Sequence, residues 1–178
     1  MPPPPVILAT PRMELTEMLP SDAPEAFALN ADPEVVRYTG DGPFASMAAA
    51  HSFLAAYPDY RAYGYGRWAL RRREDGAFLG WCGLKYHPDS RETDLGYRLH
   101  RRYWGQGYAT EAGRACLDYG FWRLGLTRII AQVMAANLAS IRVLEKCGMG
   151  AVASIAYEGE PGLLYSIDRP KSRLRLVK

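Results

Sequence analysis

The stretch Tyr-Arg-Leu-His-Arg-Arg-Tyr-Trp-Gly-Gln-Gly-Tyr-Ala-Thr, residues 97–110, decides the fold. It begins as a strand, continues as Arg102-x-x-Gly105-x-Gly107 and passes into an alanine-rich segment that favours a helix. Two glycines at this spacing allow a tight turn in which consecutive backbone N–H groups face the same way. Such a turn at a helix N-terminus suits a pyrophosphate, so the pattern predicts a site for a phosphorylated cofactor.

Other glycine-rich phosphate motifs are excluded by their spacing. The third glycine of a dinucleotide fingerprint would fall on Thr110, and the chain contains no Gly-x-x-x-x-Gly-Lys-Ser/Thr sequence. Neither nicotinamide nor P-loop chemistry is therefore supported. A Gly-x-Gly alone also fits an ordinary turn at a helix boundary, so further sequence context has to decide.

That context is a second motif, Asn137-Leu-Ala-Ser140-Ile-Arg-Val-Leu-Glu-Lys-Cys-Gly148. In order and spacing the two motifs resemble motifs A and B of the GNAT superfamily of acetyl-CoA-dependent N-acetyltransferases, most closely its RimJ/RimL-like branch. The resemblance implies an α/β fold with acetyl-CoA as the acetyl donor and an amine as the acceptor.

The periodicity of the remaining chain fits that fold. We expect a mixed, mostly antiparallel central sheet of about six to seven strands with helices on both faces. One opening strand broken by Pro11, a three-strand meander before the glycine turn, a strand after the main helix and a closing hairpin account for the sheet. On that main helix, we expect one buried face made by Tyr108, Ala112, Ala115, Tyr119 and Trp122.

Length and charge indicate a small single-domain protein. At 178 residues and 48% hydrophobic content, residues 6–169 are expected to form one domain and residues 170–178 a basic C-terminal tail. The excess of 22 Lys+Arg over 19 Asp+Glu comes from five basic residues within the last ten, and without them the count is 17 against 19. The body of the protein therefore has no basic excess that would indicate nucleic-acid binding.

Cysteine and histidine usage predicts no metal site. Cys82, Cys116 and Cys147 lie in apolar segments without Cys-x-x-Cys spacing, which favours buried reduced thiols, and the three histidines are scattered. The N-terminus lacks a signal-peptide pattern, and no stretch approaches the ~18 apolar residues of a membrane span. A cytoplasmic protein without membrane attachment is the expectation, with a homodimer as a possible assembly.

The resemblance also assigns cofactor contacts. Tyr97 and Leu99 would offer backbone groups to the pantetheine amides, as a sheet edge does to an added strand. Asn137 would contact pantetheine, and Ser140 would lie near the thioester sulfur; helix capping explains the same two residues without a ligand. The pyrophosphate loop would comprise Arg102, Gly105, Gln106, Gly107, Tyr108 and Ala109, with Thr110 adding a hydroxyl donor.

The residues that would transfer protons depart in part from the pattern of the GNAT superfamily. Many GNAT enzymes carry a tyrosine acid four residues after the Ser140 position, but this chain has Leu144, which leaves Ser140 as the best proton donor to the leaving thiolate. Asp94 is the leading base because it aligns with the family's acidic residue two positions before Gly96-Tyr97. Glu92, on the same strand face, is the fallback, and an ordered water is the expected relay.

Two functions fit these residues. The first is acetyl transfer to a primary amine, such as a protein N-terminus or a small molecule, by direct attack in a ternary complex. The second is a non-catalytic acyl-CoA sensor. Several aromatic residues could form an acceptor wall, although core packing explains most of them equally well: Tyr57, Tyr60, Tyr63, Tyr65, Trp68 and Trp81.

Overall fold

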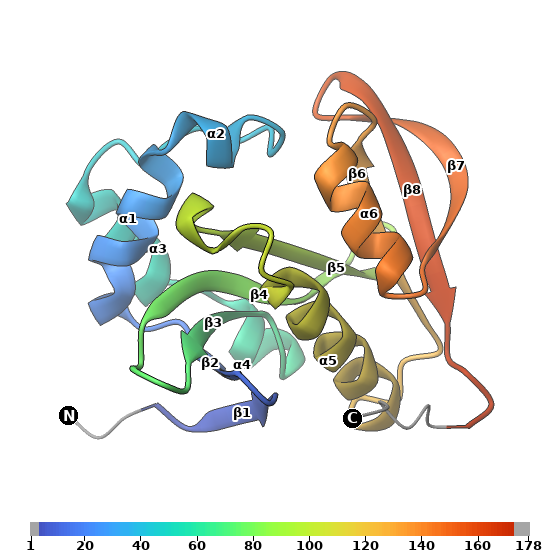
Figure 1. Ribbon diagram of the computed structural model, residues 1–178, viewed down its shortest axis with the longest axis horizontal. Helices are drawn as coiled ribbons and strands as arrows, with labels where there is room; N and C mark the ends of the chain where they lie inside the picture. The colour runs from blue at the N-terminus through green and yellow to red at the C-terminus, as the bar shows by residue number, and fades with distance from the viewer. Residues whose placement is uncertain (1–3, 173–178) are drawn as a thin grey trace.

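A computed structural model describes residues 4–172, which form one eight-stranded sheet with helices on both faces (Figure 1). The expected tail at residues 170–178 falls mostly outside the described residues. The strands are β1 (Val6–Ala9), β2 (Met13–Glu17), β3 (Arg67–Arg72), β4 (Phe78–His87), β5 (Glu92–Leu99), β6 (Arg128–Met134), β7 (Gly150–Tyr157) and β8 (Glu160–Asp168). They lie in the order β1-β2-β3-β4-β5-β6-β8-β7.

The mixed, mostly antiparallel sheet is confirmed, but it has eight strands rather than six to seven. The opening segment is two strands instead of one strand interrupted at Pro11. Thr10 donates its backbone N–H to the Met13 carbonyl at 2.8 Å, and the chain reverses there, so that β1 pairs antiparallel with β2. The proline lies in the turn, where its missing N–H removes no ladder hydrogen bond.

The one parallel junction in the sheet lies between β5 and β6, and it is short. These strands are paired at a single position, Asp94 with Ile130, whereas β5 pairs with β4 over its whole length. Beyond Asp94 the two strands diverge. The edge of residues 95–99 that faces away from β4 is therefore largely left for another partner, although the Leu99 carbonyl accepts the Trp104 indole N–H at 2.8 Å.

Helices cover the two faces as expected. On one face α5 (Tyr108–Trp122) and α6 (Leu138–Lys146) lie side by side and pack on a large core (Figure 1). On the other face α1 (Ala23–Ala31) and α3 (Met47–Ala55) pack on a smaller cluster with Ala69 and Phe78. Neighbouring strand residues such as Trp68 and Ala69 serve opposite faces, as strand geometry requires.

The predicted buried face of α5 was partly wrong. Ala115, Tyr119 and Trp122 are only half-buried, and the fully buried positions include Cys116 and Gly120. A Cβ at Gly120 would come within 2.7 Å of the Ile129 side chain, so this glycine lets the helix lie directly on the sheet. Glycines carry no apolar signal, and a pattern based on hydrophobic spacing therefore misplaced the face.

Side chains cap two helix starts around the smaller cluster. Asp32 accepts the Glu34 N–H at the start of α2 (Pro33–Val36), and Ser46 accepts the Ala49 N–H at the start of α3. The sequence reading missed α4 (Asp59–Tyr63), which Gly64 ends in a left-handed conformation. Among the described residues, no helix is both long enough and apolar enough to cross a membrane.

Candidate active site

The glycine turn lies where the sequence predicts it, between β5 and the N-terminus of α5. Gly105 and Gly107 have φ angles of 72° and 82°, and Gly107 is the N-cap of α5. A Cβ at Gly105 would meet nothing, and one at Gly107 would meet only the Arg12 side chain at 3.4 Å. The left-handed backbone therefore favours glycine at both positions. The first N–H groups of α5 have no intrahelical acceptor, as at any helix start, and no side chain caps them, so they can bind an anion.

Arg12 holds this loop from a distant part of the chain. Its guanidinium donates to the Gln106 carbonyl at 2.9 Å and to Glu111 at 2.6 Å, and it lies 4.3 Å from the centre of the Tyr108 ring. Burial alone would raise the pKa of Glu111, but hydrogen bonds from Thr10 and Arg12 hold that pKa below its usual value. A charged Glu111 beside an anion site needs this neutralisation. The sequence reading missed Arg12 because the contact spans 94 residues.

Arg102 lies on the exposed side of the loop, with 61% of its side chain accessible. Its backbone carbonyl accepts the Gln106 side-chain amide at 2.8 Å. An open cavity of about 720 Å³ runs along α5 and shares Gly107 and Thr110 with the loop. Three cationic residues, Arg114, Arg123 and Lys146, line it, and Arg114 ties α5 to the end of α6 by donating to the Lys146 carbonyl at 2.6 Å.

Asn137 and Ser140 meet at the start of α6. The Asn137 side chain accepts the Ser140 N–H at 3.1 Å, so Asn137 is the N-cap. The Ser140 hydroxyl has a different partner: the Tyr97 hydroxyl of β5 donates to it at 2.9 Å. Burial raises the pKa of Tyr97 to about 12, and the bond to Ser140 reduces this rise. The sequence pointed to the Tyr97 backbone but gave no signal for its side chain.

Leu144, at the position of the family's tyrosine, has 3% of its surface exposed and belongs to the core under α5 and α6. The Tyr97 hydroxyl instead reaches the start of the same helix from the sheet. Tyr97 and Ser140 thus form a hydroxyl pair beside the diverging strands.

Asp94 lies on the opposite face of β5 in a buried ion pair. Arg67 donates to both carboxylate oxygens at 2.9 Å, and His87 Nε2 lies 3.0 Å from one of them. Burial alone would raise the pKa of Asp94, but Arg67 and His87 hold it below its usual value. Arg67 crosses β5 over Gly96, where a Cβ would come within 2.6 Å of the guanidinium. Glu92, two residues before Asp94 on β5, is the register partner of His87 on β4.

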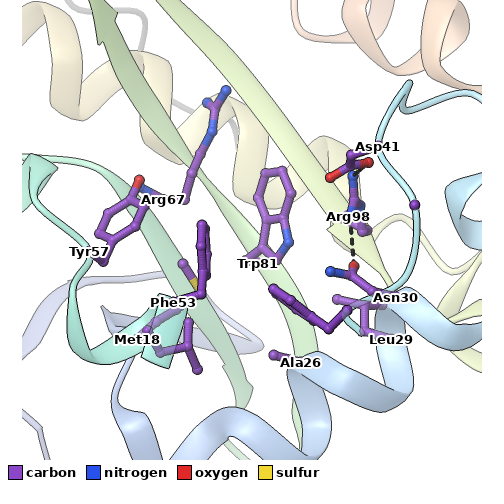
Figure 2. A pocket seen from close by; sticks show the side chains of 13 residues that line it. Met18, Ala26, Leu29, Asn30, Asp41, Phe53, Tyr57, Arg67, Trp81 and Arg98 are labelled. Atoms are coloured by element: carbon purple, nitrogen blue, oxygen red, sulfur yellow. Dashed lines mark hydrogen bonds and ion pairs between the residues drawn. The ribbon is translucent and has the colours of Figure 1, made fainter. Parts of the chain in front are cut away.

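A cavity of about 250 Å³ opens on this face between the sheet, α1 and α3 (Figure 2). In Figure 2, Trp81 lies between Phe53, Tyr57 and Arg67 on one side and Arg98, Asn30 and Asp41 on the other. Arg98 donates to Asn30 at 2.6 Å and to Asp41 at 2.7 Å. The whole lining is Met18, Ala26, Leu29, Asn30, Asp41, Gly42, Phe44, Phe53, Leu54, Tyr57, Arg67, Trp81 and Arg98.

Of the aromatic residues considered for an acceptor wall, Tyr57 and Trp81 line this cavity. Trp68 is buried in the larger core on the other face, and Tyr65 is buried with its hydroxyl 2.7 Å from Thr93. Tyr60 donates to the Arg67 carbonyl, and Tyr63 packs on Tyr86. Phe44 and Phe53 complete the wall, and no sequence motif marked them.

The buried thiols make no metal site. Cys82 and Cys116 are fully buried 3.7 Å apart, and burial raises the pKa of Cys116 well above its usual value. Within residues 4–172, no three His, Cys, Asp or Glu side chains come together as metal ligands would.

Comparison with known proteins gives a consistent result. A family model described as an acetyltransferase (GNAT) domain matches residues 12–150. The uncharacterized N-acetyltransferase p20 of Bacillus licheniformis is 32% identical over 94% of this chain and 90% of its own length. The uncharacterized protein YkkB of Bacillus subtilis is 40% identical over 59% of this chain and 62% of its own length.

The fold is also found among solved structures. The ribosomal L7/L12 α-N-protein acetyltransferase RimL, solved in complex with coenzyme A, superimposes with a TM-score of 0.77 at 16% identity. The alignment covers 92% of this chain and 98% of that one.

Proposed function

The chain belongs to the GNAT family of acetyl-CoA-dependent N-acetyltransferases, and we propose that it transfers the acetyl group directly to a small primary amine held on the α1/α3 face of β5. The observation that supports this arrangement is the divergence of β5 and β6. It leaves the edge of residues 95–99 between the glycine loop on one side and the cavity of about 250 Å³ on the other.

The residues present fit acetyl-CoA, which supplies an acetyl thioester. The strand edge at Tyr97, together with the N–H of Leu99, suits the pantetheine amides, and the N-terminus of α5 at Gly107 suits the pyrophosphate; the Leu99 carbonyl is held by Trp104. Arg12 neutralises Glu111 and fixes the Gln106 carbonyl, so the loop is already organised. Arg102, exposed at the loop, is a further phosphate contact in this proposal.

We propose that Asp94 assists the removal of a proton from the attacking amine. An ammonium with a pKa near 10 must lose a proton before its nitrogen can attack. With its pKa lowered, Asp94 is ionised at neutral pH but is too weak a base for direct abstraction. Its role is therefore to hold and polarise an ordered water that carries the amine proton to solvent, on the side where the partly exposed His87 contacts Asp94.

Ser140 is assigned to the departing thiolate, with Tyr97 as its positioning residue. As the new C–N bond forms and the C–S bond breaks, Ser140 Oγ donates its proton to sulfur. Tyr97 already donates to that oxygen at 2.9 Å and orients it, and the pair regains the transferred proton from solvent as CoA leaves. Its raised pKa keeps Tyr97 protonated through neutral pH, so the pair is ready to donate before each turnover.

Acetyl-CoA binding and amine-dependent thiol release together test the function. Acetyl-CoA at about 100 times its dissociation constant should stabilise the fold by roughly 2.7 kcal/mol, visible as a rise in melting temperature. A panel of primary amines should then release free CoA thiol and yield N-acetyl product by mass spectrometry. Stabilisation without turnover on any amine would favour the alternative, an acyl-CoA sensor. No stabilisation at millimolar acetyl-CoA would refute both.

A further inference from the structure

We propose that the acceptor is a small primary amine carrying one aromatic ring on a short alkyl chain, with the ring seated beside Trp81 in the cavity of about 250 Å³. This inference rests on the proposed function and adds the class of acceptor. It comes from four features of the cavity: its lining, its charges, its distance from Asp94 and its mouth.

The lining suits a ring. Phe44, Phe53, Tyr57 and Trp81 surround the space, and Phe44 and Phe53 lie 5.5 Å apart at a tilt of 52°. Rings in such tilted or edge-to-face arrangements gain about 0.5–1.5 kcal/mol beyond area burial. The volume is slightly below the ~300–1,000 Å³ of drug-sized ligand sites, which fits one ring rather than a longer chain.

The charges disfavour a polyamine. Two guanidinium groups face the cavity: those of Arg67 and Arg98 lie 5.5 and 5.4 Å from the Trp81 ring centre. Asp41 is the one carboxylate in the described lining, and it is already bound to Arg98 at 2.7 Å. A second ammonium on the acceptor would therefore lie beside two guanidinium groups with no unpaired carboxylate in the described lining to neutralise it. A neutral ring avoids this cost of burying an unpaired charge.

A short alkyl chain spans the distance from the cavity to Asp94. Arg67 links the two, because its guanidinium lies 5.5 Å from the Trp81 ring centre and 2.9 Å from the Asp94 carboxylate. An amine joined to a ring beside Trp81 by a few single bonds therefore reaches the neighbourhood of Asp94.

The mouth of the cavity favours a small molecule over a protein N-terminus. Gly40, in the loop before α3, is in contact with the Glu158 side chain at the β7–β8 turn, and even a Cβ at Gly40 would overlap it. These two segments bridge the cleft and narrow the path for a polypeptide.

The test compares acceptors on the full-length protein at saturating acetyl-CoA, with free-thiol release and product mass as readouts. The acceptors are 2-phenylethylamine, butylamine, spermidine and a peptide that begins with alanine. We expect kcat/KM for 2-phenylethylamine to exceed that of each of the other three at least tenfold. Higher kcat/KM for spermidine or the peptide would overturn the inference.

A matched pair of variants locates the effect. Phe53→Ala removes a half-exposed ring from the cavity wall, and Tyr63→Ala removes a ring of similar exposure that packs on Tyr86 outside the lining. Phe53→Ala should lower the ratio of kcat/KM for 2-phenylethylamine over butylamine about tenfold, and Tyr63→Ala should leave it unchanged. Equal effects of the two variants would overturn the inference.

The inference and the function on which it rests fail in different ways. If acetyl-CoA stabilises the protein and other amines are acetylated but 2-phenylethylamine is not, the acceptor class is wrong and the transferase assignment stands. If acetyl-CoA neither stabilises the protein nor is consumed with any amine, the proposed function itself is wrong.

Discussion

The two sides of β5 are built in different ways. On the α5/α6 side the site consists mainly of backbone: a free strand edge, two left-handed glycines and a helix N-terminus, all within residues 95–110. On the α1/α3 side it consists of side chains from separate elements, such as Phe53 from α3, Arg67 from β3 and Asp94 from β5. The proposed cofactor side is therefore continuous in sequence and the proposed acceptor side is not.

This difference predicts how each side responds to substitution. A site made of backbone tolerates changes of side chain but not of backbone conformation. A site made of buried side chains, such as the Arg67–Asp94 ion pair, is sensitive at each of those residues. Substitutions on the two sides should accordingly affect different steps of the reaction.

The largest effect is expected on the cofactor side. Gly107→Val should abolish the acetyl-CoA-dependent rise in melting temperature and reduce turnover to background, because a β-branched residue does not adopt a φ of 82° without strain. Differential scanning fluorimetry and thiol release measure the two effects.

Gly76→Val is the matched control. Gly76 has a φ of 72° in the β3–β4 turn and, like Gly107, has ample room for a Cβ. The strain should cost about 1–3 kcal/mol of stability but leave acetyl-CoA binding intact. If Gly76→Val also abolished binding, general instability rather than the loop would explain the first result.

Asp94→Asn tests the acceptor side. Turnover on an accepted amine should fall by about 10²–10⁴, the range expected for loss of a positioned base, while acetyl-CoA affinity changes no more than a few fold. Glu92→Gln, two residues away on the same strand face, should have a smaller effect. If both variants kept the wild-type rate, solvent alone would deprotonate the amine.

The Arg67–Asp94 ion pair should make the free energy of unfolding depend on pH. The pKa of Asp94 is lowered in the folded protein, so its contribution is fully present above the unfolded pKa of about 3.9 and is lost as pH falls through the folded value. Asp94→Asn should cost about 3 kcal/mol near pH 7, because it leaves Arg67 buried without its carboxylate. The difference in unfolding free energy between wild type and variant should shrink below about pH 4 in urea titrations. A difference that grew on acidification would contradict the assigned direction.

The contrast between the two sides also explains what the sequence could reveal. The glycine turn, the start of α6 at Asn137 and the mixed sheet follow from local patterns, and they were predicted. Such backbone motifs can be recognised in a sequence because turns and helix caps depend on residues that are neighbours in the chain. The roles of residues at that site, including Arg102, Asn137 and Ser140, stay predictions until they are tested by substitution.

Contacts made across the fold could not be predicted. Arg12 reaches Gln106 over 94 residues, and Arg67 reaches Asp94 over 27. In both cases an arginine in an ordinary strand or turn carries no local mark of its partner. The Tyr97–Ser140 bond was missed for the same reason, although both residues were already candidates for other roles.

Two hydroxyl variants separate leaving-group assistance from helix capping. Ser140→Ala should lower turnover about tenfold to a hundredfold if its hydroxyl donates to the thiolate. The cap should survive, because Asn137 accepts the backbone N–H of residue 140 and not its side chain. The melting temperature should therefore stay close to that of the wild type.

Tyr97→Phe should lower kcat by a similar or smaller factor with little change in the KM for acetyl-CoA, since the backbone edge is retained. If Tyr97 acts through Ser140, the double variant should be little slower than Ser140→Ala alone. Fully multiplicative losses would show that the two hydroxyls act separately, and a normal rate in Ser140→Ala would leave the reaction without a protein proton donor.

The smallest effect is expected at Arg12, which supports the backbone site without forming it. Arg12→Ala should weaken acetyl-CoA binding about three- to tenfold, in line with the ~0.2–1 kcal/mol of a partly exposed ion pair plus the loss of the bond to the Gln106 carbonyl. Isothermal titration calorimetry gives the change, and Arg37→Ala, at an exposed ion pair on α2's end, controls for loss of positive charge. If Arg12 serves mainly to neutralise Glu111, adding Glu111→Gln should restore much of the affinity. If it serves mainly to fix the loop, the second substitution should restore nothing, because the Gln106 carbonyl would still lack its donor.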